Sequence, residues 1–199
     1  MLSKNDYDLL HQKVFGDSYK GYRPTVKEIP NGDGKIDNDK RFAHIAEKYN
    51  PDTELLEFLE KGHQLSLLVA QALNVPKTFM PVRKYAVLRV LEYPVGAITN
   101  EHEDFDLFTL MLYRDQPDKF IYHWVDMPHE VKVLNAQCHL GQIATEIGLG
   151  AAVKHSVLAS DKPQHSIVYF AIPDHEAILP SGITVGEWLN ERMARSRIY

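Results

Sequence analysis

The second half of the chain most constrains the fold, because after Pro81 it consists of short runs of β-forming residues separated by turn-like stretches. Most of these runs have no helical pattern between them. Many short strands in succession predict a sandwich or a barrel, not a parallel α/β sheet. The runs are KYAVLRVLEY, FTLMLY, FIYHWV, VKVLNA, AAVKHSVLA and HSIVYFAI.

The first eighty residues have a different character, with loops and helices. Residues 4–15 space their apolar side chains as a short amphipathic helix does. Glycine and proline interrupt residues 16–38, which we expect to be a loop. Residues 53–73 carry the strongest helical pattern in the chain, with Thr53 as the expected N-cap. Helical support for the core is therefore expected from residues 41–74.

The elements together predict one compact unit. Residues 1–80 would form a shortened N-terminal loop and helical support segment, and residues 81–199 a β core with a C-terminal helix. That last helix is expected over residues 184–196, where Glu187 follows Thr184 at the spacing of a capping box.

Composition excludes several classes of function. The net charge is −5, and no basic stripe suggests binding to nucleic acid. No apolar run approaches the roughly 18 residues of a membrane span, and the N-terminus has charges where a signal peptide needs apolar residues. The single cysteine, Cys138, allows no disulfide within the chain. We therefore expect a cytoplasmic protein without membrane or nucleic-acid partners.

A candidate metal site lies in the stretch NEHEDFDLFTLMLY. His102 and Asp104 are two residues apart, so on a strand their side chains point to the same face. A third ligand from another strand would complete a triad on one side of a metal, leaving open positions as non-haem iron(II) enzymes require. An H-x-D pair alone is weak evidence in a chain with ten histidines.

The residues around this pair resemble the isopenicillin N synthase-like family of 2-oxoglutarate/iron(II) oxygenases. VLRVLEYP and HEDFDLFTLML match the family's LRLxxYP strand and its H-[TS]-D-[YF]-G-x-L-T-L-L segment. AAVKHSV resembles the K-S-x-x-H-R-V segment, which places the third ligand at His155. KGYRP and TVGEWLNERMARSRIY resemble the family's ends, so the likeness covers about the whole chain. The family's first strand and helix are expected to be absent.

The resemblance implies a mainly β fold, a distorted double-stranded β-helix (jelly roll) with flanking α-helices. It implies Fe(II) bound by His102, Asp104 and His155, with 2-oxoglutarate and O2 as cosubstrates. A small-molecule substrate would be oxidised by hydroxylation, desaturation or cyclisation.

The sequence departs from the family where 2-oxoglutarate is anchored. The family's R-x-S pair, whose arginine binds the distal carboxylate, falls at Gln164 and Ser166, so the arginine is absent. Ser166 is retained, and Tyr93 matches the family tyrosine that binds the same carboxylate. Candidates for a replacement cation are Lys162, Arg89 and Lys154.

The missing arginine leaves two further hypotheses open. The chain could be an iron-dependent oxidase that does not use 2-oxoglutarate, with electrons supplied by the substrate. It could also be a metal-binding or small-molecule-binding module without redox turnover, as the short N-terminal part suggests.

Overall fold

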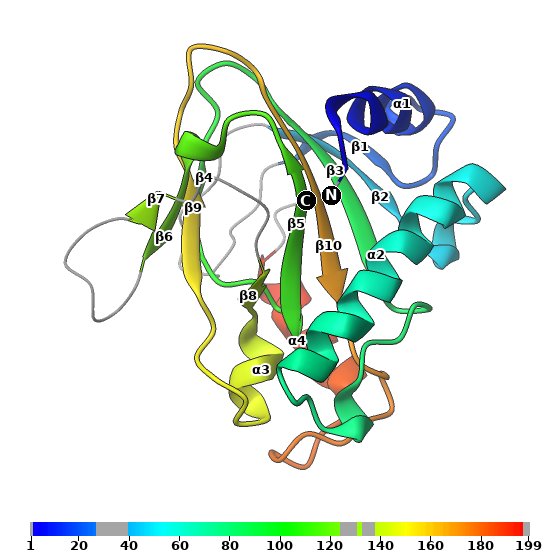
Figure 1. Cartoon of the computed structure of the whole chain (residues 1–199), viewed down its shortest axis with the longest axis vertical. Helices are drawn as coiled ribbons and strands as arrows, with labels where there is room; N and C mark the ends of the chain where they lie inside the picture. The colour runs from blue at the N-terminus through cyan, green and yellow to red at the C-terminus, as the bar shows by residue number, and fades with distance from the viewer. Residues whose placement is uncertain (1, 27–39, 124–130, 133–137, 197–199) are drawn as a thin grey trace.

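Two antiparallel β-sheets face each other in the computed structural model, which describes residues 2–26, 40–123, 131–132 and 138–196 (Figure 1). The larger sheet has the strand order β1-β2-β3-β10-β5-β8 and the smaller one β4-β9-β6-β7. This architecture confirms the expected mainly β jelly roll with flanking helices. The strands are β1 (Tyr22–Val26), β2 (Lys40–Ile45), β3 (Val87–Tyr93), β4 (Thr99–His102), β5 (Phe108–Arg114), β6 (Phe120–His123), β7 (Val131–Lys132), β8 (Cys138–Leu140), β9 (Lys154–Val157) and β10 (Gln164–Ala171).

Within the described residues, four α-helices accompany the sheets. Two of them, α1 and α2, cover the face of the larger sheet that points away from the smaller one (Figure 1). The helices are α1 (Lys4–Val14), α2 (Thr53–Ala72), α3 (Gln142–Glu146) and α4 (Val185–Ser196), with short 3₁₀ turns at Glu47–Tyr49, Lys77–Phe79 and Pro117–Lys119. In the described part of the chain, no helix combines the length and apolar character needed to cross a membrane.

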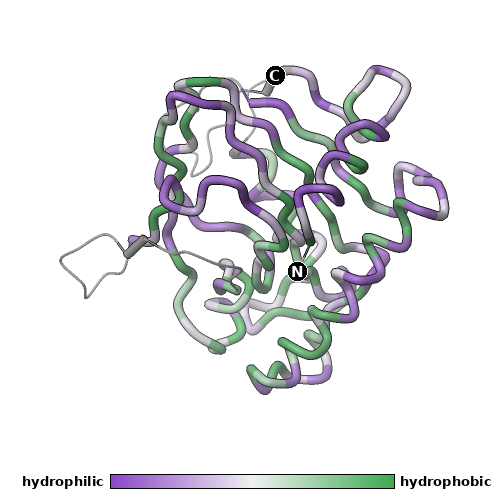
Figure 2. Tube along the Cα trace, turned by 45° about the horizontal axis from the view of Figure 1, so that its top comes forward, coloured by the Kyte–Doolittle hydropathy of each residue, from purple (hydrophilic) through white to green (hydrophobic). Residues whose placement is uncertain are grey.

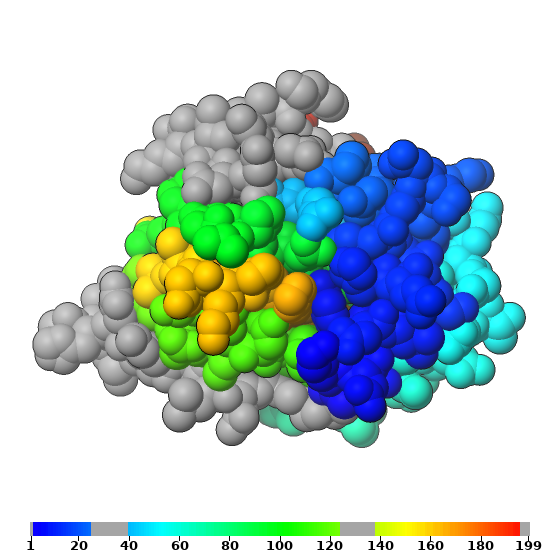
Figure 3. Space-filling view, turned by 90° about the horizontal axis from the view of Figure 1, so that it is seen from above, coloured from blue at the N-terminus to red at the C-terminus, as the bar shows by residue number. Residues whose placement is uncertain are grey.

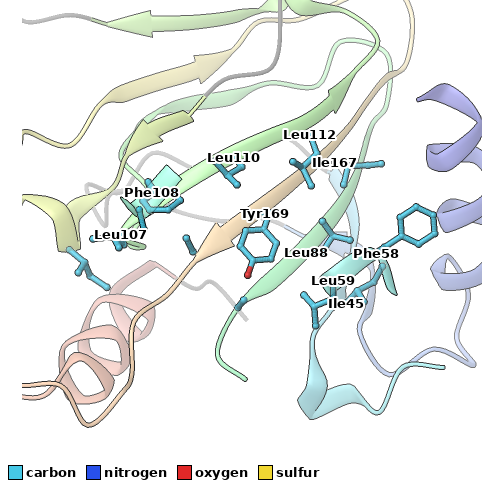
Figure 4. Packing of buried hydrophobic residues seen from close by; sticks show 14 of the residues in the cluster. Ile45, Phe58, Leu59, Leu88, Leu107, Phe108, Leu110, Leu112, Ile167 and Tyr169 are labelled. Carbon is cyan, nitrogen blue, oxygen red and sulfur yellow. The ribbon is translucent and has the colours of Figure 1, made fainter. Parts of the chain in front are cut away.

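The larger sheet divides its side chains between two packed layers because successive residues of a strand point to opposite faces. On β3, Leu88 and Val90 pack toward the helices, whereas Leu91 and Tyr93 pack toward the smaller sheet. Figure 4 shows the helix-facing layer, in which side chains of β3, β5 and β10 meet those of α2. Figure 2 shows hydrophobic and hydrophilic positions alternating along α2, as expected for a helix with one buried face.

α2 packs closely against the larger sheet at Gly62. A Cβ atom at this position would lie 2.5 Å from Cδ2 of Tyr169, whose ring is fully buried on β10. Only a residue without a side chain therefore allows this packing distance.

The Gly62→Val variant is expected to lose about 1–3 kcal/mol of folding free energy, because the buried Tyr169 ring cannot move aside without disturbing the core. Chemical denaturation of the purified proteins measures the effect. Leu68→Val is the matched control, since it puts valine into the same helix at an exposed position. Equal stability of the two variants would contradict the packing argument.

Helix predictions are confirmed, and parts of the N-terminal loop and support predictions are wrong. The helices expected over residues 4–15, 53–73 and 184–196 are present, although Asp52 and not Thr53 caps α2. The capping box of α4 forms as expected, with the Glu187 backbone N–H donating to the Thr184 hydroxyl.

Two strands lie where the sequence indicated loop or helix. Residues 16–38 contain β1, and the expected support segment 41–74 begins within β2. These strands pair with each other and β2 pairs with β3, so residues before Pro81 extend the larger sheet. β3, the strand that pairs with β2, lies far from it in the sequence, so local sequence patterns do not predict this pairing. Residues 27–39 and most of VKVLNA are outside the described residues.

The N-terminal helix α1 packs against β3 and β10 of the larger sheet. The Tyr7 hydroxyl donates to the backbone oxygen of Leu91, and its ring lies 4.9 Å from that of His165 between centroids. Figure 3 shows the N-terminal segment (dark blue) beside the stretch that leads into β10 (orange).

Candidate metal centre

Three side chains expected to bind metal converge in the structure. His102 ends β4 and is the cross-strand partner of His155 on β9, while Asp104 follows β4 directly. One potential ligand atom from each residue lies within 4.8 Å of the other two. The Nε2 atoms of His102 and His155 each lie 3.7 Å from a carboxylate oxygen of Asp104. The adjacent-strand pairing thus brings together residues that are far apart in sequence.

Backbone contacts orient both imidazole rings. Nδ1 of His102 lies 2.8 Å from the oxygen of Asn100, and Nδ1 of His155 lies 3.1 Å from the oxygen of Val153. A carbonyl oxygen only accepts, so each Nδ1 carries the proton and each Nε2 keeps its lone pair. Each ring therefore presents an unprotonated Nε2 beside the Asp104 carboxylate, so that the three groups can share one metal ion.

The protonation states also suit a metal. Burial lowers the pKa of His155 well below its usual value, which favours the neutral ring. Burial alone raises the pKa of Asp104, but neighbouring His155 and a hydrogen bond from His139 outweigh burial and hold this pKa well below its usual value. A neutral histidine and an ionised carboxylate are the forms that coordinate a cation, so the donor set fits a divalent metal.

Sequence reasoning missed His139, the third histidine beside the triad. Its Nε2 lies 2.9 Å from Oδ2 of Asp104, and its Nδ1 lies 2.9 Å from the hydroxyl of Tyr122. Since the ionised carboxylate can only accept, Nε2 donates to Asp104 and Tyr122 donates to Nδ1. The Thr109 hydroxyl donates to the same Oδ2 at 2.5 Å. His139 and Thr109 are paired residues of β8 and β5, a relation that no local spacing reveals.

A buried acid packs behind this network. Burial and the nearby charge of Asp104 raise the pKa of Asp106 well above its usual value, which favours the neutral carboxyl group. A Cβ atom at Gly141 would lie 2.2 Å from Oδ1 of Asp106. Glycine at that position therefore allows the chain before α3 to pass directly over Asp106.

A cavity of about 250 Å³ opens beside the triad, between the two sheets. Its size is near the lower end of small-molecule sites, which span about 300–1,000 Å³. The larger sheet supplies one wall and the metal ligands belong to the other. The wall from β3, β5 and β10 includes Val87, Arg89, Leu91, Tyr93, Thr109, Met111, Arg114, Gln164, Ser166, Val168 and Phe170.

Three of the residues expected to anchor a cosubstrate lie in this wall. Gln164 pairs with Tyr93 across β10 and β3, and Ser166 lies two residues further along the same face. The Gln164 amide donates to the backbone oxygen of Leu158 at 2.8 Å, so one of its two protons is already engaged. Lys162 is exposed and is not among the residues that line the cavity.

The other cations proposed from the sequence lie apart from these anchors. Lys154 is exposed on β9, with Nζ 3.5 Å from Oε1 of Glu101. Arg89 does line the cavity, four residues before Tyr93 on the same face of β3.

Arg114, which sequence reasoning did not consider, lies beside the cosubstrate anchors. It is the β5 partner of Ser166 and lines the same cavity. Its guanidinium carbon lies 3.8 Å from the ring centroid of Phe120, and Phe120 stacks on the His155 ring at 5.0 Å. One phenyl ring therefore links this cation to a metal ligand.

A β-bulge aims Arg114 into the cavity. β10 pairs Val168 with Met111 but Ile167 with Tyr113, so Leu112 is an extra residue on β5. The extra residue reverses the alternation of the strand beyond it. Arg114 consequently shares the inner face with Met111, whereas uninterrupted alternation would point it toward the helices.

Arg114 carries an uncompensated charge. Burial lowers its pKa from 12.5 to about 10, so the guanidinium remains protonated at neutral pH. Within the described residues, no carboxylate forms an ion pair with it. A buried cation that faces a cavity without an acidic partner favours an anionic ligand.

Comparisons with known proteins support the fold. No family model matches the chain, and no curated protein matches it. A candidate oxygenase from Shewanella oneidensis aligns with 96% of this chain and 84% of its own, at 19% identity and a TM-score of 0.70. A full-length Neurospora crassa protein in complex with alpha-KG aligns with 97% of this chain and 78% of its own, at 17% identity and a TM-score of 0.64.

A third solved structure, a dioxygenase for auxin oxidation in rice, aligns with 96% of this chain and 81% of its own, at 14% identity and a TM-score of 0.62. The chain therefore shares the fold of these proteins, and its His102, Asp104 and His155 cluster lies beside the cavity between its two sheets.

Proposed function

We propose that this protein is a non-haem iron(II) oxygenase that uses 2-oxoglutarate and O2 to oxidise a small molecule. The convergence of His102, Asp104 and His155 beside a cavity carries the proposal. Two histidines and one carboxylate on one side of the metal are the ligands that iron oxygenases use. Similar folds hold alpha-KG in the Neurospora crassa protein and 2OG with Fe in JOX2. Membership of the isopenicillin N synthase-like family and a cytoplasmic location belong to the same proposal.

Bound iron(II) would supply the open positions for 2-oxoglutarate and O2, whose reaction with the substrate would give succinate, carbon dioxide and the oxidised product, with water as a further product of desaturation or cyclisation. The chain's own residues position and protect this chemistry. His139 and Thr109 fix the Asp104 carboxylate through hydrogen bonds. The apolar residues of the cavity wall exclude water from it. Hydroxylation, desaturation and cyclisation are all compatible with this arrangement.

In this proposal, Arg114 replaces the family arginine that is absent at Gln164. Its guanidinium would bind the distal carboxylate of 2-oxoglutarate, with Tyr93 and Ser166 as hydrogen-bonding neighbours. The pairing of Ser166 with Arg114 supports this role, because it places the cation one strand away from Gln164. The change from arginine to Gln164 is thereby compensated by a cation from the neighbouring strand.

The visible spectrum tests the proposal. Apo protein is loaded anaerobically with Fe(II), and 2-oxoglutarate is then added. A weak metal-to-ligand charge-transfer band is expected, because the keto and adjacent carboxylate groups would chelate the metal. Protein that binds no Fe(II) would overturn the metal site. Stoichiometric Fe(II) without a band would overturn the cosubstrate.

Gln164 favours a second candidate, an iron-dependent oxidase that does not consume 2-oxoglutarate. This candidate predicts O2 uptake with substrate and no succinate. Stoichiometric release of succinate from added 2-oxoglutarate would exclude it. A metal-binding module without turnover predicts no O2 uptake under either condition.

The His139→Ala variant is expected to bind Fe(II) about 10–100-fold more weakly, because Asp104 loses the donor that orients it. Competition with a metal-sensitive dye measures this affinity. His165→Ala is the matched control, since His165 is a partly exposed histidine that pairs with Asp115. Unchanged metal affinity in His139→Ala would show that Asp104 needs no such support.

A further inference from the structure

A second cation, Arg89, lines the cavity away from the cosubstrate anchors. Its guanidinium carbon lies 4.5 Å from the ring centroid of Phe42 and 4.9 Å from that of Phe170. Its Nε donates to Nε2 of His44 at 2.7 Å. The two aromatic rings and the histidine hold this side chain in one orientation.

The remaining donors of Arg89 have no protein partner among the described residues. Contacts with ring faces leave the in-plane N–H groups of a guanidinium available. In the same part of the chain, no carboxylate pairs with Arg89, and the only hydrogen bond of its side chain is the one to His44. The planar pair of terminal nitrogens suits a carboxylate, which can accept two parallel hydrogen bonds.

The acids that line the cavity are engaged elsewhere. Glu103 accepts a hydrogen bond from the side chain of Gln142, and Asp104 belongs to the metal site. Asp106 packs against Gly141 and is hydrogen-bonded to the Thr109 hydroxyl. Lys48 also lines the cavity. Among the described residues that line the cavity, no acid therefore pairs with Arg89.

One molecule of 2-oxoglutarate cannot neutralise both arginines. One of its two carboxylates would chelate the metal, which leaves one for a guanidinium. Ser166 pairs with Arg114, and Val168 pairs with Arg89, so the arginines are two residues and two strands apart. Spacings of about 3.3 Å along a strand and 4.8 Å between strands separate their Cα atoms by roughly 12 Å. Arg89 therefore belongs to a separate anion subsite.

Resting on the function proposed above, we propose that the primary substrate carries a carboxylate bound by Arg89. The rest of the substrate is largely apolar, because apolar side chains flank Arg89 and Phe170 along their strands. Val87 lies two residues before Arg89, and Ile172 lies two residues after Phe170. Leu189 and Met193 of α4 add further apolar side chains to the lining of the cavity.

Matched acids and amides test this subsite. Protein loaded anaerobically with Fe(II) and 2-oxoglutarate is titrated with hexanoate, octanoate and 3-phenylpropionate, and separately with their primary amides. Calorimetry measures binding. The acids are expected to bind about tenfold or more tightly than the amides, because only the acid forms a charge-assisted pair. Arg89→Gln should remove this preference, and the surface control Arg195→Gln should retain it.

The two proposals fail in different ways. Absence of the 2-oxoglutarate band would overturn the proposed function and this inference with it. A normal band would leave the proposed function standing, and the measured binding of the acids and amides would then test this inference. It is overturned if no acid binds, if acids and amides bind equally, or if the preference persists in Arg89→Gln. An acid preference that depends on Arg89 and persists in Arg114→Gln supports a separate subsite.

Discussion

Asp104→Ala is expected to abolish stoichiometric Fe(II) binding, and with it the charge-transfer band that 2-oxoglutarate produces. The change removes the only acid of the triad and leaves His139 without its acceptor. The loss of affinity should exceed the roughly 10–100-fold that removal of a supporting contact costs. Anaerobic equilibrium dialysis followed by metal analysis measures the bound iron.

A matched control separates this effect from misfolding. Asp118→Ala removes an aspartate from an exposed 3₁₀ turn away from the cavity and should bind iron as the unaltered chain does. The thermal unfolding midpoint of Asp104→Ala apo protein is measured in parallel. Full iron binding by a folded Asp104→Ala protein would disprove the triad.

Arg114→Gln is expected to weaken 2-oxoglutarate binding by about 10–100-fold while Fe(II) binding remains intact. A charge-assisted hydrogen bond contributes about 1.5–3 kcal/mol, and Arg114 has no acidic partner in the described residues that would otherwise use its charge. Titration of the charge-transfer band with 2-oxoglutarate gives the dissociation constant. An unchanged constant would remove Arg114 from the cosubstrate site.

A compensating variant makes this test independent of stability. Gln164→Arg returns a guanidinium to the position where the family carries it, on the strand next to Arg114. In the Arg114→Gln background, this second change should recover most of the lost affinity. Lys162→Gln tests the exposed lysine, and we expect no change there because its side chain does not line the cavity.

The sequence by itself determined the class of fold and, where alternation along a strand is uninterrupted, the face on which a strand residue lies. Alternation on β3 separates Leu88 from Arg89 because the pleat period is an intrinsic property of an extended chain. The spacing of His102 and Asp104 indicated a shared site, but the strand β4 ends at His102, so the pleat does not set the position of Asp104. Likeness to the oxygenase family, not spacing, pointed to His155. Helix ends were predictable because caps such as Thr184 with Glu187 are local contacts.

Only the tertiary structure decided which strands meet and in what register. Pairing of β4 with β9 sets His102 opposite His155, and pairing of β5 with β8 brings His139 to Asp104. Such contacts join residues distant in sequence, so no local pattern contains them.

The bulge at Leu112 is the clearest example of a feature that only the tertiary structure decides. Simple alternation from Met111 would turn Arg114 away from the cavity, and one extra residue on β5 turns it inward. The bulge exists only relative to the partner strand β10, because it is a mismatch in count between two paired strands. The sequence therefore revealed that the family arginine was missing, whereas the sheet register placed another arginine beside its position.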